Sequence, residues 1–203
     1  MARIGEDASL ARQASETANA SLVSPAMLLA TMMMYVRLWL LIFVLGYYST
    51  AARLAGPFLS LALGSAVAAF ILYRQRAAMP KATAPALKHP LELSTAALFA
   101  VLFAAFAALT QFVISHYGGT GLHVLSFVTG LTDIDPFILS LLAGKYTLAT
   151  TQIAAAILIA SGSNNLFKCG YALALGRNRA VLGAAIWLAI LFAATIGYVF
   201  WIH

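Results

Sequence analysis

Gly130-Leu131-Thr132-Asp133-Ile134-Asp135-Pro136 lies in the middle of an apolar run from about Gly121 to Gly144. A bilayer core of about 30 Å needs roughly 20 helical residues, so this run is long enough to span it. An ionised group near the membrane midplane costs at least about 2.5 kcal/mol unless it is compensated. The sequence therefore places two carboxylates, Asp133 and Asp135, where each needs a partner.

A break in the helix at this stretch would bring both carboxylates to one side. An intact helix turns about 100° per residue, so Asp133 and Asp135 would point to nearly opposite faces, one of them toward lipid. The residue before a proline avoids the α region, and Gly130 permits backbone conformations closed to other residues. We therefore predict a helix interrupted within Gly130–Pro136, with both carboxylates turned inward. The alternative is an intact helix with one aspartate neutral and the other packed against a neighbour.

The composition of the chain is that of a multi-span helical membrane protein. Of its 203 residues 63% are hydrophobic and 9% are charged, and its mean hydropathy is +0.92. A soluble domain carries about 25% charged residues. The formal charge of +6 is not a nucleic-acid footprint, because most of the excess lies in two membrane-flanking segments. These segments hold Arg74, Arg76, Lys81 and Lys88, then Arg177 and Arg179.

The apolar runs predict an all-α bundle of about six transmembrane helices after a polar lead-in, residues 1–20. The predicted spans are residues 22–46, 57–73, 91–115, 121–144, 148–176 and 181–201. Pro57 is expected in the first turn of the second span. A second interruption is expected at Ser161–Asn165, which is polar and lies in the middle of the fifth span. His116–Gly121 predicts a tight turn.

The number of crossings bears on which loops share a side of the membrane. Six crossings would put both termini on one side and would put Arg177 and Arg179 opposite the basic linker, residues 74–90. Basic loops usually face the cytoplasm, so this arrangement goes against the charge rule. The alternative is that residues 121–144 fold back as a re-entrant hairpin; we favour six crossings. A 3+3 inverted repeat, with Leu29–Arg37 laid on Leu125–Asp133, would also place basic loops on both sides.

Four ionisable groups lie well inside the predicted spans, and their formal charges sum to zero. Such groups usually face a bundle interior or a water-filled cavity and pair with one another. Asn164 lies one helical turn before Lys168, so these two share a face. We predict one midplane polar site of the kind that transporters build; the alternative is a charge network that only clamps the bundle. The candidate residues are Arg37, Thr132, Asp133, Asp135, Ser161, Asn164, Asn165 and Lys168.

The expected ligand is a small ion. Asp133 and Asp135 would bind a cation, with a metal ion as the tentative case, or would relay protons. Asn164 and Asn165 would supply neutral ligands, while Arg37 and Lys168 would be counter-charges. A Mg²⁺ ion would keep most of its water. We expect no enzyme activity and no resident cofactor, because the sequence contains no Walker loop, nucleophile elbow, HExxH or dinucleotide fingerprint.

Several stretches together resemble an uncharacterised membrane domain that is commonly fused behind an MgtC/SapB-type domain. They are SFVTGLTDIDPFILSLL (126–142), AAAILIASGSNNLFKCGYALALGRNR (154–179), MMMYVRLWLLI (32–42) and HPLEL (89–93), and the resemblance covers roughly residues 20–200. The Gly-Leu-x-Asp-x-Asp pattern of that domain falls here on Gly130, Leu131, Asp133 and Asp135, and its Asn-x-x-x-Lys pattern falls on Asn164 and Lys168. Pro136 departs from it, because a small residue is expected there.

The resemblance implies a bacterial inner (plasma) membrane protein with a link to magnesium. Independently of the resemblance, the midplane polar site leads us to expect a transport protein that moves a small cation or a proton-coupled solute. The alternative is a regulatory or scaffold module that binds another membrane protein, such as an MgtC-like domain, and moves nothing. Ala154–Ala156, Ala160 and Gly162 would then form a helix-packing face for that partner or for a homodimer. No nucleic-acid partner is expected.

Overall fold

The described part of the chain is entirely helical. The structure is a computed structural model that describes residues 24–74, 93–144, 146, 148–175 and 179–202, and these residues contain no strand. The predicted lead-in (1–20), most of the basic linker (75–92) and the loop 176–178 lie outside the described residues. The predicted all-α class is confirmed.

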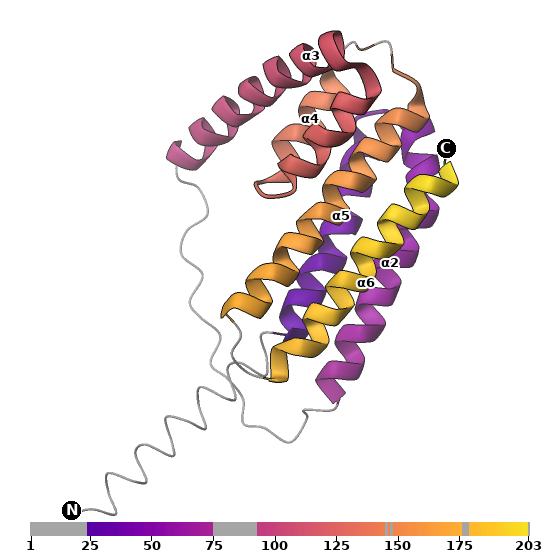
Figure 1. Ribbon diagram of the computed structural model, residues 1–203, viewed down its shortest axis with the longest axis vertical. Coiled ribbons are helices and arrows are strands. Elements are labelled where there is room, and N and C mark those ends of the chain that lie inside the picture. The colour runs from indigo at the N-terminus through magenta and orange to yellow at the C-terminus, as the bar shows by residue number, and fades with distance from the viewer. Residues whose placement is uncertain (1–23, 75–92, 145, 147, 176–178, 203) are drawn as a thin grey trace, which may run out of the picture.

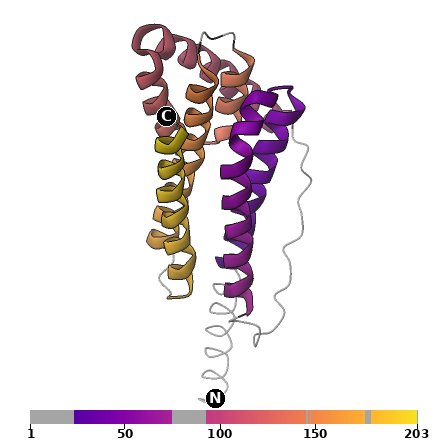
Figure 2. The same ribbon diagram turned by 90° about the vertical axis from the view of Figure 1, so that its right-hand side faces the viewer.

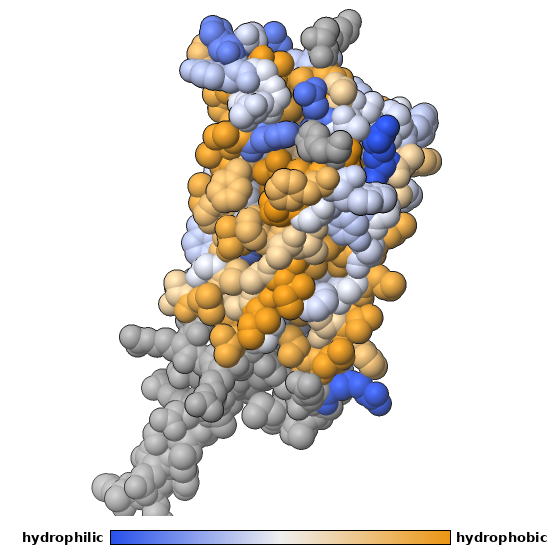
Figure 3. All heavy atoms as spheres, turned by 45° about the vertical axis from the view of Figure 1, so that its right-hand side comes forward, coloured by the Kyte–Doolittle hydropathy of each residue, from blue (hydrophilic) through white to orange (hydrophobic). Residues whose placement is uncertain are grey.

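Within the described residues, six helices form a bundle with an apolar surface. They are Ser24–Val44, α2 (Tyr48–Arg74), α3 (Leu93–Thr129), α4 (Ile134–Ala143), α5 (Thr150–Leu175) and α6 (Arg179–Ile202). Four helices within the described residues are long and apolar enough to cross a membrane: Ser24–Val44, Tyr48–Arg74, Ala97–Thr129 and Val181–Ile202. On the face in Figure 3, apolar side chains cover the middle of the bundle and hydrophilic side chains gather toward its ends. This is the pattern of a multi-pass membrane protein.

α5 is the central helix. It contacts α2, α3, α4 and α6, and every residue from 154 to 163 is buried. α5 and α6 lie side by side in Figures 1 and 2. They pack closely, because a Cβ added to Gly162 would lie 2.2 Å from Thr195 Oγ1. The small-residue face predicted for a partner or a second copy is therefore used inside the chain, so that assignment of the face is wrong.

α5 is also continuous through Ser161–Asn165, so the predicted interruption of the fifth span is wrong. Ser161 Oγ donates to the carbonyl oxygens of Ile157 at 2.7 Å and Leu158 at 3.1 Å. Ser163 Oγ donates in the same way to Ala160 O at 3.0 Å. Hydroxyl groups that bond back to their own helix are satisfied without opening the backbone.

α2 begins well before the predicted start of the second span. It starts at Tyr48, and Pro57 lies inside the helix rather than in its first turn. Membrane helices tolerate an interior proline, because neighbouring groups satisfy the backbone that it frees. Trp39 Nε1 donates to Ala51 O at 3.0 Å, so the early turns of α2 are held against the preceding helix.

The chain reverses direction at Gly118. Its φ of 59° and ψ of −147° lie in a region that glycine adopts far more readily than other residues. This reversal is the predicted turn at His116–Gly121. Residues 119–129 then run back into the bundle, and α4 returns toward the end from which they came (Figure 1). α4 has 10 residues and the arm before it is of similar length, so each arm spans about 15 Å, half of a bilayer core.

Residues 119–143 therefore form a helical hairpin, the backbone arrangement expected for the alternative to a single crossing. The Tyr47 hydroxyl donates to Leu142 O, so the end of α4 lies beside the turn that follows the first helix. With the hairpin in place of a crossing, the first helix begins at one end of the bundle and α6 finishes at the other (Figure 1), whereas the six predicted crossings would place both on one side.

The segments of the proposed inverted repeat differ in local structure. Leu29–Arg37 lies within one continuous helix, whereas Leu125–Asp133 contains the end of α3 and the cap of α4. The overlay also set Arg37 against Asp133, whereas the ion pair in the structure joins Arg37 to Asp135. Two segments related by an internal repeat should have the same local structure. Because these two differ, their backbone gives the repeat no support.

Candidate functional site

The tip of the hairpin, defined as Gly130–Asp133, lies against the middle of α5. A Cβ on Gly130 would come within 1.8 Å of Ser163 Oγ and 2.7 Å of Asn164 N. Asn164 Nδ2 donates to Gly130 O at 3.1 Å. Gly130 is therefore required for close approach to α5 and not, as the sequence had indicated, for an unusual backbone conformation, since its φ is not positive.

Local hydrogen bonds explain why the helix breaks at the tip. Thr132 Oγ1 donates to Thr129 O at 3.1 Å and helps to close the first arm. Asp133 has an extended backbone, and its Oδ1 accepts a hydrogen bond from Asp135 N at 3.2 Å, so it caps α4. Pro136 lies in the first turn of α4, where no intrahelical N–H bond is lost. The predicted interruption within Gly130–Pro136 is confirmed.

An ion pair joins the hairpin to the first helix. Arg37 Nη2 lies 2.5 Å from Asp135 Oδ2. The Asp135 side chain is 15% exposed and that of Arg37 is 60% exposed, so the carboxylate is enclosed while the guanidinium reaches the surface. It is the one ion pair found within the described residues. The expectation that intramembrane charges from separate spans pair with one another is met at these two residues.

Three separate segments line one groove of about 880 Å³ at the tip. Its polar lining consists of Arg37 from the first helix, Thr132 and Asp133 from the tip, and Asn164 and Lys168 from α5. The rest of its wall is Ile134 at the start of α4 and an apolar face of the first helix, which includes Ala30, Met33 and Val44. Five of the eight predicted site residues thus lie on one surface, and Asp135 adjoins it through Arg37.

Lys168 is held in the groove without a carboxylate partner among the described residues. Its Nζ donates to Met34 Sδ at 3.4 Å. The thioether is a weak acceptor, so this contact only partly replaces the water that an ammonium group normally binds. Lys168 is therefore a cation available to a ligand.

Ser161 and Asn165 do not line the groove. Ser161 is fully buried and bonds to its own helix. Asn165 is also fully buried, and its Nδ2 donates to the Tyr35 hydroxyl at 2.6 Å. Neighbouring residues of a helix point about 100° apart, so Asn164 faces the tip while Asn165 faces the first helix. No sequence pattern points to Tyr35, because its partner Asn165 lies far away along the chain.

Three buried side-chain oxygens on α4 and α5 accept no hydrogen bond. They are Asp135 Oδ1, Asn164 Oδ1 and Asn165 Oδ1. A buried acceptor without a partner costs about 1–3 kcal/mol. Such atoms favour a bound water or cation. The described residues contain no group of three or more His, Cys, Asp or Glu side chains that could hold a metal ion, so a cation here would rely on two carboxylates, amide oxygen and water.

Comparison with known proteins gives a family but no activity. A family model described as a domain of unknown function, DUF4010, matches residues 7–176. An uncharacterized protein of Aquifex aeolicus (strain VF5) is 37% identical over 95 residues, which are 46% of this chain and 41% of that protein. The chain thus spans about two fifths of the length of this relative. No solved structure matches the chain. Because the family model covers most of its length, the chain belongs to the DUF4010 family.

Proposed function

We propose that this protein transports a small ion, either a cation such as Mg²⁺ or a proton-coupled solute, through the groove at the hairpin tip. One observation carries the proposal: the re-entrant hairpin sets two carboxylates beside two cationic side chains and an amide at mid-depth of the bundle. A polar cluster is costly inside a membrane. Transporters accept this cost because broken helices and midplane charges bind their substrates.

Oxygen ligands in the groove favour a hard cation. Asp133 is exposed to the groove, and both Asp135 Oδ1 and Asn164 Oδ1 lack a donor. Carboxylate, amide and water oxygens are the usual ligands of Mg²⁺, which retains several waters because it dehydrates reluctantly. A groove of about 880 Å³ has room for a hydrated ion. The aspartates also provide proton acceptors if the cargo is a solute moved with protons.

Arg37 acts in this proposal as a displaceable counter-ion. It neutralises Asp135 when no cargo is bound, and its exposed side chain is free to swing away. An entering cation then takes its place against Asp135. Lys168, on the α5 wall of the groove, repels the bound cation and so limits the affinity of the site for the ion. A site that binds too tightly would not release its ion.

Flux into liposomes tests the proposal. The purified protein is reconstituted, and Mg²⁺ entry and proton movement are followed with enclosed dyes for wild type, Asp133→Asn and Asp135→Asn. Losing one good ligand interaction of about 1.4 kcal/mol lowers affinity tenfold, so we expect flux to fall at least about tenfold at subsaturating ion. Ser140→Ala is the matched control on α4, because Ser140 Oγ bonds only to Phe137 O of its own helix. Folded wild-type protein that moves neither ion under any imposed gradient would refute the proposal.

A charge exchange separates an ion site from a structural clamp. The double variant Arg37→Asp with Asp135→Arg keeps an ion pair but moves the carboxylate onto the first helix. A clamp would recover both stability and flux in this variant. The proposed site predicts recovered stability with flux still lost, because the carboxylate no longer lies at the tip. Single variants complete the double-mutant cycle.

The second candidate is a non-transporting regulatory or scaffold module that binds another membrane protein, such as an MgtC/SapB-type domain. The observation favouring it is the stretch Ala97–Thr129 of α3, whose most apolar window is only 6% buried inside the chain. A helix with so few intramolecular contacts offers a surface to a partner helix or to a second copy. Absence of flux together with crosslinking from Val101, which is 64% exposed, to a membrane partner would favour this candidate.

A further inference from the structure

The two ends of the bundle differ in their charge. One end, named the hairpin end, carries the turn at residues 45–47, the Gly118 reversal and the start of α5. The other end carries the end of α2 at Arg74 and the start of α6 at Arg179, and is named the basic end (Figure 1). Chain direction requires this division, because α2 and α5 both start at the hairpin end and run away from it.

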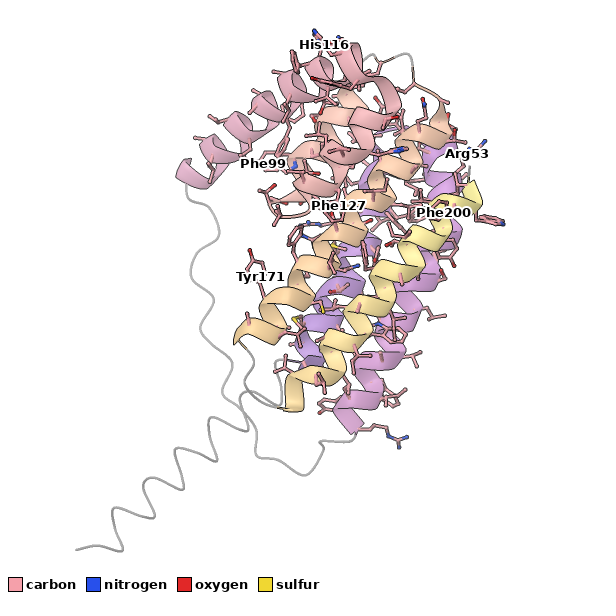
Figure 4. All side chains as sticks on the ribbon, in the orientation of Figure 1. Arg53, Phe99, His116, Phe127, Tyr171 and Phe200 are labelled. Atoms are coloured by element: carbon pink, nitrogen blue, oxygen red, sulfur yellow. The ribbon has the colours of Figure 1, made fainter. Side chains whose placement is uncertain are left out.

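The basic residues are distributed unequally between these ends. In sequence, Arg74, Arg76, Lys81 and Lys88 follow α2 before α3, and Arg177 and Arg179 join α5 to α6. Both segments start from the basic end. Among the described residues, Arg53 lies near the start of α2 at the hairpin end, and in sequence one further basic residue, Lys145, separates α4 from α5. Figure 4 shows Arg53 and His116 toward the hairpin end and Tyr171 farther toward the basic end.

The hairpin explains how both basic segments can obey the rule that basic loops face the cytoplasm. A single crossing by residues 121–144 would have placed the two basic segments on opposite sides. Because the hairpin enters and leaves at one end, α2 ends and α6 starts at the same end of the bundle, and each of these helix ends adjoins one of the two basic stretches of the sequence. Short loops rich in Lys and Arg remain in the cytoplasm, so the basic end is the cytoplasmic end.

The groove reaches the hairpin end but stops short of the basic end. Its lining on the first helix runs from Ala30 to Val44, the last residue of that helix. Toward the basic end, Ala30 lies six positions after Ser24, the first described residue of that helix, which is a distance of about 9 Å. On α5 the lining residue nearest the basic end is Lys168, also more than one turn before the helix ends.

We infer that the hairpin enters the membrane from the side opposite the cytoplasm and that the groove with Asp133 and Lys168 is open to water on that side. A ligand from outside the cell therefore reaches the tip, while the turns of the first helix and of α5 beyond the groove lining lie between the groove and the cytoplasm. This orientation goes beyond the proposed transport activity and does not depend on it.

Cysteine labelling from each side tests the orientation. All variants carry Cys169→Ser, which removes the native buried thiol. Tyr117→Cys reports the hairpin end and Tyr73→Cys the basic end; the two side chains are 66% and 58% exposed, so they form a matched pair. Thr132→Cys and Met33→Cys report the two walls of the groove. A membrane-impermeant maleimide is applied to spheroplasts and, separately, to inverted vesicles.

In spheroplasts we expect a reaction at position 117 and at one or both of the groove positions, 132 and 33. We expect the cysteine at position 73 to react only in inverted vesicles. Labelling of position 73 in spheroplasts, or of position 117 only in inverted vesicles, would overturn the orientation. Labelling of position 117 in spheroplasts with both groove positions silent there would overturn the outward opening. If position 73 reacts in spheroplasts and position 117 only in inverted vesicles, while flux still depends on the carboxylates, the orientation is refuted and transport is not. If the labelling is as expected but the protein shows no flux, transport is refuted and the orientation is not.

Discussion

Two polar stretches lie at similar depth in this bundle, and only one of them breaks its helix. Residues 130–136 end one helix and begin another, whereas residues 161–165 continue α5 without interruption. Both contain a glycine and several polar side chains, so hydropathy alone treats them alike. The difference lies in where the side chains find hydrogen-bond partners.

The breaking stretch contains groups that compete with the helix backbone. Asp133 accepts a hydrogen bond from a backbone N–H of the next helix, and Pro136 is suited to a first turn. In the unbroken stretch, the serines donate to carbonyl oxygens of their own helix and the asparagines project to other segments. Polarity at mid-depth therefore does not interrupt a helix unless a side chain can cap a new one.

The largest expected effect tests the contact between these two stretches. In Gly130→Ala the added Cβ meets Ser163 Oγ and the backbone N of Asn164. Overpacking against backbone that cannot move costs about 3 kcal/mol of unfolding free energy, the upper part of the usual range. Unfolding in detergent, followed by circular dichroism, measures it. Gly170→Ala on α5 is the control, because nothing lies within 4 Å of its Cβ. Full rescue by Ser163→Ala would contradict the role of the α5 backbone.

A smaller loss is expected at the glycine inside α5. The added Cβ of Gly162→Ala meets mainly Thr195 Oγ1, the end of a side chain. We expect a loss of about 2 kcal/mol in unfolding free energy, and recovery of most of it in the double variant with Thr195→Ala. The same detergent unfolding assay measures both. If the double variant is no more stable than the single one, the added Cβ is opposed by the α5 and α6 backbones rather than by the Thr195 side chain.

Removal of the α4 cap is expected to lower the free energy of unfolding less than either glycine substitution. Asp133→Ala removes the side chain that accepts from Asp135 N, and loss of such a cap costs about 1 kcal/mol. Asp133→Asn keeps an acceptor and should retain the stability while it lowers flux. Measuring both variants by unfolding and by flux separates capping from charge. Equal destabilisation by the two variants would mean that the charge, rather than the cap, stabilises the tip.

The smallest expected effect comes from the unbroken stretch. Ser161→Ala removes hydrogen bonds to carbonyls that already accept from the helix backbone, and alanine is the better helix former. We expect a change within about 0.5 kcal/mol in unfolding free energy and an unchanged helix content by circular dichroism. A loss comparable to that of Gly162→Ala would show that Ser161 has a role outside its own helix.

Most residues of the site could be predicted from the sequence, but the direction in which each side chain points could not. Charged residues in apolar runs identify themselves, because their cost in a membrane demands partners, and this reasoning found Arg37, Asp133, Asp135 and Lys168. It could not decide which asparagine faces the tip. Asn164 and Asn165 are equivalent in composition and depth, and only the position of the hairpin against α5 assigns them to different neighbours.

By itself, the sequence determined that the chain is a bundle of membrane-type helices broken at Gly130–Pro136, because the lengths of the apolar runs and the cost of turning one of two nearby carboxylates toward lipid can be read along the chain. Only the tertiary structure decided that residues 119–143 fold back, that α5 stays whole at the centre, and which faces meet. These outcomes depend on contacts between distant segments, such as Tyr47 with Leu142 and Gly130 with Ser163. No local pattern encodes such contacts, because each requires two surfaces to fit.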